Sequence, residues 1–282
     1  MARNLHKYEE ITPYEFEQEK ERASIVYVAA GPLEYHEECN ILGLDTNKGY
    51  DWCLAAAEIT GGIVFPMLPI APAAAPPFRS REELRARYDL PRHRDHYEES
   101  FGSLYPSVFF SREVCRALYM ELLEMLALEL QFKMCVFIGS HGPAGRMLKQ
   151  IIAEETSEPN GRVGTFHGMR VLVAGSNDYN RDLVTAFNKE HGIPKAYHGG
   201  VWETALNYAI KPEYFHPEML DETKYPQHFG PLCEEASEEH SRPSKYEFRQ
   251  FSPEFAKELR EVTIQRLVED VQKNYAEITG GK

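Results

Sequence analysis

The sequence predicts an α/β fold with a largely parallel sheet that is covered by helices on both faces. Short apolar segments alternate along the chain with longer stretches in which apolar residues recur at helical spacing. Of the 282 residues, 43% are hydrophobic and 12% are aromatic, which is enough for a sizeable core. No internal repeat and no convincing boundary divides the chain, so we expect a single domain.

The first elements have clear sequence signals. Thr12 can cap a helix, Pro13 suits the first helical position, and Glu15 completes a capping box, so a helix is expected to begin here. The apolar run 24–30 follows and stops at Gly31, which is typical of a short, fully buried strand.

The remaining elements alternate in the same way: helix 47–59, strand 63–65, helix 111–130, strand 133–138, a helix that follows the turn 139–145 and ends at 155, strand 169–173, and helices 181–191, 201–210 and 253–279. The spacing of Val114, Leu118 and Leu122 predicts the helix after Ser111. Gly192 and Pro212 give the stop signals of the helices 181–191 and 201–210.

Two segments show no regular period. Residues 66–77 are rich in proline and alanine and residues 78–99 are densely charged, so we expect a long surface connection there. Residues 212–252 read as a long irregular excursion, which could serve as a lid or a subunit contact. Its two histidines, His228 and His240, are interpreted as solvated surface groups.

Composition excludes several classes of function. A formal net charge of -13 argues against non-specific binding to nucleic acid and against docking on an anionic membrane. The first residues lack the apolar region of a secretory signal, and no apolar run approaches the roughly 18 residues of a membrane span. The five cysteines form no CxxC pair and predict reduced thiols. We therefore expect a cytoplasmic protein.

The densest polar cluster follows the strand 24–30, at its carboxyl end, where open α/β sheets place their ligand crevices. Glu34 and His36 are two residues apart and would project to the same side of an extended segment, and Asp45 follows an apolar turn before the next helix. Two carboxylates and an imidazole suit Zn, Mn or Fe. Solvated loop residues are the simpler alternative, and Glu37 and Glu38 could compete as ligands.

Two further clusters lie at comparable places. His141 lies in the glycine-rich turn 139–145, which could instead cradle a phosphate but matches no known phosphate-loop pattern; Ser140 is a poor candidate for a nucleophile because the turn is no G-x-S-x-G elbow. The segment 197–205 places Glu203 in the first turn of a helix, where an acid also favours the helix dipole.

Taken together, these motifs resemble those of the creatininase family of metal-dependent amidohydrolases. The ordered matches are Glu34-x-His36 followed by Asp45, then Gly102–Val108, then Ile138-Gly-Ser-His141-Gly142, then His198-Gly-Gly-Val-Trp-Glu203-Thr-Ala205, within residues 11–210. The set departs from the family in the walls of the site: Tyr35 replaces the usual Gln, Glu37 replaces a Gly, and Pro143 follows the second motif. Transfer of a particular substrate, creatinine included, therefore does not follow.

The resemblance implies a three-layer α/β/α sandwich, commonly assembled as a homo-hexamer, with two divalent ions in each subunit. Glu34 and His141 would hold one ion, His36 and Glu203 would hold the other, and Asp45 would bridge them.

The resemblance also implies roles around the ions. His198 would be the catalytic acid/base, and Tyr35 and Trp202 would contact the substrate, although a tryptophan at this place more often serves packing.

The implied activity is opening of a small cyclic amide, or cleavage of a formamide, by attack of a metal-bound hydroxide. The alternatives are ring-opening C–C hydrolysis of a cyclic diketone such as a dehydro-inosose, a non-catalytic binding protein on the same fold, and a nucleotide-binding protein.

Overall fold

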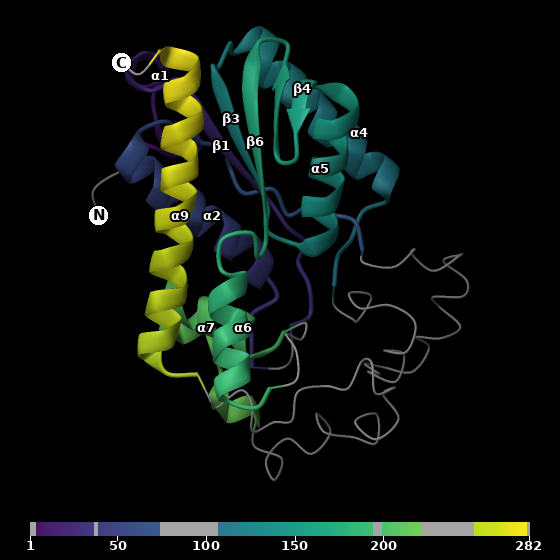
Figure 1. Ribbon diagram of the computed structural model, residues 1–282, viewed down its shortest axis with the longest axis vertical. Helices are drawn as coiled ribbons and strands as arrows, with labels where there is room; N and C mark the ends of the chain where they lie inside the picture. The colour runs from purple at the N-terminus through teal and green to yellow at the C-terminus, as the bar shows by residue number, and fades with distance from the viewer. Residues whose placement is uncertain (1–3, 37–38, 74–106, 194–198, 221–250, 281–282) are drawn as a thin grey trace.

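The computed structural model describes residues 4–36, 39–73, 107–193, 199–220 and 251–280. A six-stranded sheet lies between two layers of helices (Figure 1). The predicted α/β/α sandwich with a mostly parallel sheet is confirmed.

The sheet has the strand order β2-β1-β3-β6-β5-β4. The strands β2, β1, β3 and β6 are parallel to one another, and β5 and β4 add an antiparallel edge. In chain order the strands are β1 (Ile25–Ala30), β2 (Ile63–Val64), β3 (Met134–Gly139), β4 (Ser157–Asn160), β5 (Val163–Phe166) and β6 (Met169–Gly175). The central strands are buried on both faces, which explains their nearly continuous apolar sequences.

Helices cover both faces of this sheet. One layer contains α2 (Leu44–Thr60), α6 (Arg181–Glu190), α7 (Val201–Ile210) and α9 (Pro253–Thr279), and the other contains α4 (Arg112–Glu124) and α5 (Gly142–Glu155) (Figure 1). The helix α1 is Pro13–Arg22, and the short turns are η1 (Tyr8–Glu10), the π-helical η2 (Met125–Glu129), η3 (Pro212–Tyr214) and η4 (Pro217–Leu220). Alternate residues of β1 face the two layers: Tyr27 packs with α2 and α9, and Val28 packs with α4 and α5.

Several sequence predictions hold closely. The capping box at the start of α1 is present, with Thr12 and Glu15 exchanging side-chain and backbone hydrogen bonds. The bounds of α7 and α9 agree with the predicted helices 201–210 and 253–279. Each of these helices has a stop or start signal within two residues of one end, which is why the agreement is close.

Two helices begin earlier than predicted, and both differences affect the polar residues. The helix α2 begins at Leu44 rather than at Asn47, so Asp45 lies in its first turn and not in the loop before it. The helix α5 begins at Gly142, inside the predicted turn, with His141 as the residue before it. In both cases the residue before the helix makes no side-chain cap, so no start signal marks these positions.

The hairpin of β4 and β5 was not predicted. The strand β4 has the sequence Ser-Glu-Pro-Asn and is exposed along its length, so it carries no apolar period. Its pairing with β5 at the edge of the sheet, rather than its own sequence, defines it as a strand.

The predictions for residues 78–99 lie outside the described residues, and so do those for most of the excursion 212–252. Three of the five cysteines, Cys53, Cys115 and Cys135, are free thiols as expected. Within the described part of the chain, every helix is too short or too polar to cross a membrane.

Asp178 stabilises the turn after β6 in its ionised form. Its carboxylate accepts the backbone N–H of Gly175 at 2.8 Å and lies 2.9 Å from the ammonium of Lys149. Burial alone would raise the pKa of Asp178, but these partners and Arg162 together lower it.

We therefore expect Asp178→Asn to reduce the free energy of unfolding by about 1–3 kcal/mol at pH 7. Because the folded pKa is the lower one, the carboxylate contributes stability above its unfolded pKa of about 3.9 and loses it as the pH falls through the folded value. Urea unfolding of both proteins from pH 7 to pH 3 should show the difference shrinking below about pH 4. A difference that stays constant over this range would contradict the assignment.

Candidate metal centre

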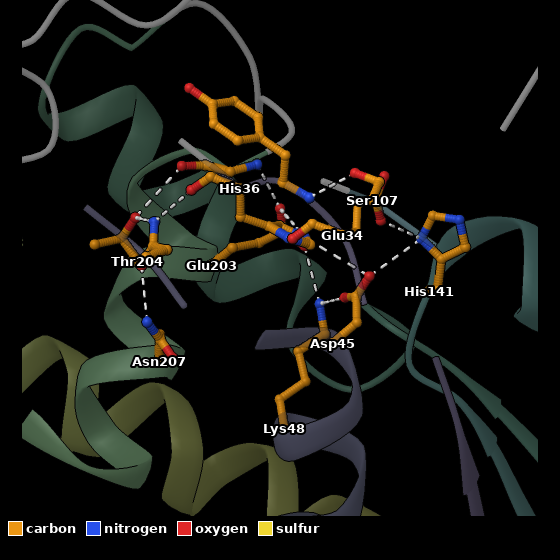
Figure 2. Close-up of polar contacts among 12 residues, drawn as sticks. Glu34, His36, Asp45, Lys48, Ser107, His141, Glu203, Thr204 and Asn207 are labelled. Carbon is orange, nitrogen blue, oxygen red and sulfur yellow. Dashed lines mark hydrogen bonds and ion pairs between the residues drawn. The ribbon is translucent and has the colours of Figure 1, made fainter. Parts of the chain in front are cut away.

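The candidate site lies at the carboxyl ends of β1 and β3. Ala30 pairs with Gly139 at the last position of the parallel register, so the segments that follow the two strands leave the sheet side by side. The first turns of α2 and α7 face the same place (Figure 2). The five predicted ligands, which come from three separate segments of the chain, converge here: Glu34, His36, Asp45, His141 and Glu203.

The loop between β1 and α2 brings the first three of these residues together. The backbone N–H of Glu34 donates to the carbonyl of Leu42 at 2.8 Å, which folds the loop back so that Asp45 faces Glu34 and His36. Ligand atoms of the three side chains all lie within 4.8 Å of one another, and all three side chains are buried. The Nδ1 atom of His36 lies 3.0 Å from the carbonyl oxygen of Glu34, so in the Nδ1–H tautomer it donates there and Nε2 faces Asp45.

His141 completes the cluster from the β3–α5 turn. Its Nδ1 atom lies 3.0 Å from Oε2 of Glu34 and 3.2 Å from Oδ2 of Asp45. The same Oδ2 atom lies 3.6 Å from Nε2 of His36. An ion with bonds of about 2.0–2.2 Å to N and O ligands holds neighbouring ligands roughly 3.0–3.5 Å apart. Nδ1 of His141 already has this separation from an oxygen of Glu34 and from an oxygen of Asp45, and the three side chains have suitable donor chemistry, so these residues fit a divalent ion.

Glu203 reaches the centre from the first turn of α7. Its Oε2 atom accepts the backbone N–H of Gly199 at 2.7 Å and lies 3.9 Å from Nε2 of His36. His36 therefore lies between Asp45 and Glu203.

Lys48 also belongs to this centre, and the sequence interpretation missed it. It lies one helical turn after Asp45 in α2 and its side chain is fully buried. Its Nζ atom lies 2.6 Å from Oδ1 of Asp45 and 2.9 Å from Oε1 of Glu203 (Figure 2). Its ammonium also lies 5.2 Å from the centroid of the Trp202 ring. The i,i+3 spacing of an acid and a lysine at a helix start is the signal that could have revealed it.

These groups hold one another in their charged forms. Burial alone would raise the pKa of Asp45, but Lys48, His36 and His141 together lower it well below its usual range. Burial would lower the pKa of Lys48, yet the carboxylates of Asp45 and Glu203 outweigh it and raise that pKa.

Two carboxylates act on His141 in the same way. Burial opposes protonation of this imidazole, but Glu34 and Asp45 raise the pKa of His141 to about 10. In the metal-free protein these two carboxylates hold a proton on Nδ1 of His141. The same carboxylates would hold a divalent ion, and binding of that ion would displace the proton.

Comparison with known proteins agrees with this arrangement at the level of the fold. No protein-family model matches the sequence, and no curated protein matches it. Solved structures do match. Creatinine amidohydrolase (creatininase) superposes with a TM-score of 0.63 at 15% identity, over 96% of this chain and 98% of that chain. The chain has the creatininase fold.

Two further creatininase structures agree with this result. A structure of creatininase with Mn gives a TM-score of 0.65 at 15% identity, over 96% of this chain and 98% of that one. A creatininase mutant of the Zn–Zn type gives 0.65 at 15% identity, over 97% and 99%. The predicted likeness to creatininase is thereby confirmed for the fold.

In this version of the creatininase fold, a buried amide network fixes the centre to α7. Asn40 donates from Nδ2 to the carbonyl of His36 at 2.8 Å and to Oγ1 of Thr204 at 2.9 Å. Asn207 in turn donates to Oδ1 of Asn40 at 2.9 Å. The backbone of His36 is therefore positioned by the helix that carries Glu203. The sequence interpretation did not single out these residues, because asparagine and threonine side chains give no spacing signal.

Of the other predicted site residues, the structure describes some and not others. His198 lies outside the described residues, as do Glu37 and Glu38. Tyr35 and Trp202 are both nearly buried, at 7% and 8% exposed, and Trp202 packs in the apolar cluster that includes α9. Their contact with a substrate stays a prediction.

Ser140 is buried beside the centre. Its hydroxyl donates to the carbonyl of Ala30 at 3.0 Å, which agrees with the expectation that it is no nucleophile.

Gly199 makes a close backbone contact with the centre. Its φ angle is +64°, and a Cβ atom there would lie 2.9 Å from the carbonyl carbon of His36. Gly199→Ala is expected to lower the free energy of unfolding by about 1–2 kcal/mol through the left-handed backbone, and further by displacing His36. Zn²⁺ affinity should fall with it.

Gly161→Ala is the matched control, because Gly161 has a φ of +61° and no atom within 4 Å of its Cβ position. It should bear the backbone cost alone and keep full Zn²⁺ affinity. Urea unfolding and Zn²⁺ titration of both variants separate the two effects. Equal stability and equal affinity of the two variants would show that the contact with His36 is unimportant.

Proposed function

We propose that this chain is a metal-dependent hydrolase that opens a small cyclic amide or cleaves a formamide. The observation that carries the proposal is the buried cluster of Glu34, Asp45 and His141, in which Nδ1 of His141 already lies at ligand spacing from a carboxylate oxygen of each acid. The fold supports it, because matching structures are a creatinine amidohydrolase, a Mn form and a Zn–Zn form of creatininase. Zn, Mn and Fe all suit such ligands.

The side chains of the centre have separable roles. When bound, a divalent ion lowers the pKa of a water molecule and polarises the carbonyl group under attack. Glu34 and Asp45 supply negative charge toward it, and His141 gives up the proton that it holds in the metal-free protein.

His36 and His198 complete the proposal. The neutral ring of His36 donates from Nδ1 to the carbonyl of Glu34 and turns Nε2 toward Asp45, where it can accept a proton during the reaction. His198 is proposed to donate a proton to the leaving nitrogen.

Burial of the centre favours this chemistry. Glu34, His36 and Asp45 are at most 1% exposed, so bulk water is largely excluded and charges interact strongly. The replacements that the sequence shows around the centre argue for a substrate other than creatinine, and a strained or cyclic small molecule remains the expected class. Assembly as a homo-oligomer, a hexamer by the resemblance, stays a prediction.

The test is a substrate panel with metal-depleted and reloaded protein. Lactams, formamides and cyclic diketones are incubated in H₂¹⁸O with protein reloaded with Zn²⁺, Mn²⁺ or Fe²⁺, and products are identified by mass spectrometry. We expect one labelled oxygen in a ring-opened acid or in formate, and no product after chelation. Label in a product of diketone opening would assign C–C cleavage instead. Absence of turnover by protein shown to hold metal, or turnover that survives chelation, would refute the proposal.

A further inference from the structure

We infer that the centre binds one divalent ion rather than two, and that the ammonium group of Lys48 takes the place of the second ion. This inference rests on the proposed function, since it concerns the same site. The first ion would bind between Glu34, Asp45 and His141. The resemblance implies that the second would bind between His36, Asp45 and Glu203. The ammonium of Lys48 contacts two of these three residues, Asp45 and Glu203.

The oxygens that a second ion needs are already bound by cationic or N–H donors. Oδ1 of Asp45 is the oxygen turned away from His141, and Lys48 binds it at 2.6 Å. Oε1 of Glu203 binds the same ammonium at 2.9 Å, and Oε2 of Glu203 accepts the N–H of Gly199 at 2.7 Å. A carboxylate that bridges two ions presents one oxygen to each, and in Asp45 only Oδ2 faces the histidines.

Lys48 is fixed in this position. Its side chain is fully buried, begins one turn after Asp45 on the same face of α2, and ends beside the ring of Trp202. An ion on the second set of donors would lie within a few ångströms of a positive charge that has no path to solvent. Like charges at such a distance in a buried site repel strongly. The ammonium therefore disfavours a second ion by charge as well as by occupying its ligands.

The charges of the described side chains also favour a single divalent ion. Glu34, Asp45 and Glu203 carry three negative charges and Lys48 carries one positive charge, so two negative charges remain. One divalent ion with neutral histidines cancels them. A second ion would leave a buried excess of two positive charges, which is costly unless it is compensated.

Lys48 then has a positioning role for the first ion. By holding Oδ1 of Asp45, it directs Oδ2 toward His141 and Glu34 before any metal binds. Its ammonium also neutralises the buried carboxylate of Glu203, which binds no metal in this arrangement.

The experiment counts ions and reports on their coupling. Wild type, Lys48→Met and a control, Lys149→Met, are equilibrated with excess Mn²⁺, passed through a desalting column, and analysed by elemental analysis and by electron paramagnetic resonance. Lys149 also forms an ion pair with an aspartate, Asp178, but outside the centre. The wild type and the control should hold about one Mn²⁺ per chain with the six-line signal of an isolated ion. Lys48→Met should hold about two, with the broadened signal of a spin-coupled pair.

Each alternative outcome is decisive. Two coupled ions in the wild type would overturn the inference and leave the proposed function intact. One ion in both the wild type and Lys48→Met would show that Lys48 does not stand in for the second ion. No ion in the wild type would overturn the proposed function and the inference with it. The wild-type measurement decides the number of ions even if Lys48→Met does not fold.

Discussion

Asp45→Asn is expected to lose bound metal and hydrolytic activity together. Oδ2 of Asp45 lies at the middle of the cluster, within 3.2 Å of His141 and 3.6 Å of His36, and the other oxygen holds Lys48. Replacing this carboxylate by a carboxamide removes a ligand and a negative charge at once. Loss of a group that merely orients a ligand costs about 10–100-fold in metal affinity, so loss of the ligand itself should exceed about 100-fold. Metal titration and turnover of the reloaded protein measure the two effects.

Asp51→Asn is the matched control for this variant. Asp51 lies in the same helix and also binds a cation, the guanidinium of Arg260, through two hydrogen bonds of 2.7 and 2.8 Å. Its replacement should cost some stability and leave metal affinity unchanged. If Asp45→Asn retained wild-type metal affinity, the centre would have been placed wrongly.

Gly139→Ala is expected to cause the largest loss of stability among single substitutions near the centre. Gly139 ends β3, and a Cβ atom there would lie 2.4 Å from the amide nitrogen and 2.5 Å from the Cα atom of Gly145. The carbonyl carbon of Ala144 would lie 2.8 Å away. All three are backbone atoms of α5, so no side-chain rotation can relieve the overlap.

Overpacking usually costs about 1–3 kcal/mol, and a clash with backbone places this variant at or above the upper value. Because α5 would have to move away from β3, His141 should also shift and metal affinity should fall. Urea unfolding and Zn²⁺ titration report the two consequences.

Gly142→Ala in the same turn provides the comparison. Its Cβ atom would meet only the end of the Arg146 side chain, at 3.4 Å, and this flexible group can move. Its stability should lie within about 0.5 kcal/mol of wild type. If the two variants were equally stable, the close packing of β3 on α5 could not be what fixes the turn.

The sequence predicts the elements that carry their own signals. The helix α1 has its capping box, α9 has Ser252 and Pro253 at its start, and the buried strands are short apolar runs bounded by glycine. The hairpin of β4 and β5 escapes prediction because its first strand is exposed and polar and depends on its pairing with the edge of the sheet.

In the candidate site, too, some residues have a clear sequence signal and others do not. Its predicted ligands could be named in advance because they match an ordered set of motifs, and all except Glu203 come after the end of a buried strand in the sequence. Lys48 was missed because a lysine near the start of a helix is ordinarily a solvated side chain, and its three-residue spacing from Asp45 is a weak signal by itself. Only the structure shows that two carboxylates and an aromatic ring enclose it. The early start of α2, which puts Asp45 and Lys48 one turn apart on the same face, is the local feature that creates this contact.

Anomalous X-ray scattering at the zinc edge, from a crystal equilibrated with Zn²⁺, locates the bound ion directly. We expect one strong peak per chain within bonding distance of Glu34, Asp45 and His141. Absence of a peak at these residues, with zinc found only on the surface or not at all, would contradict it.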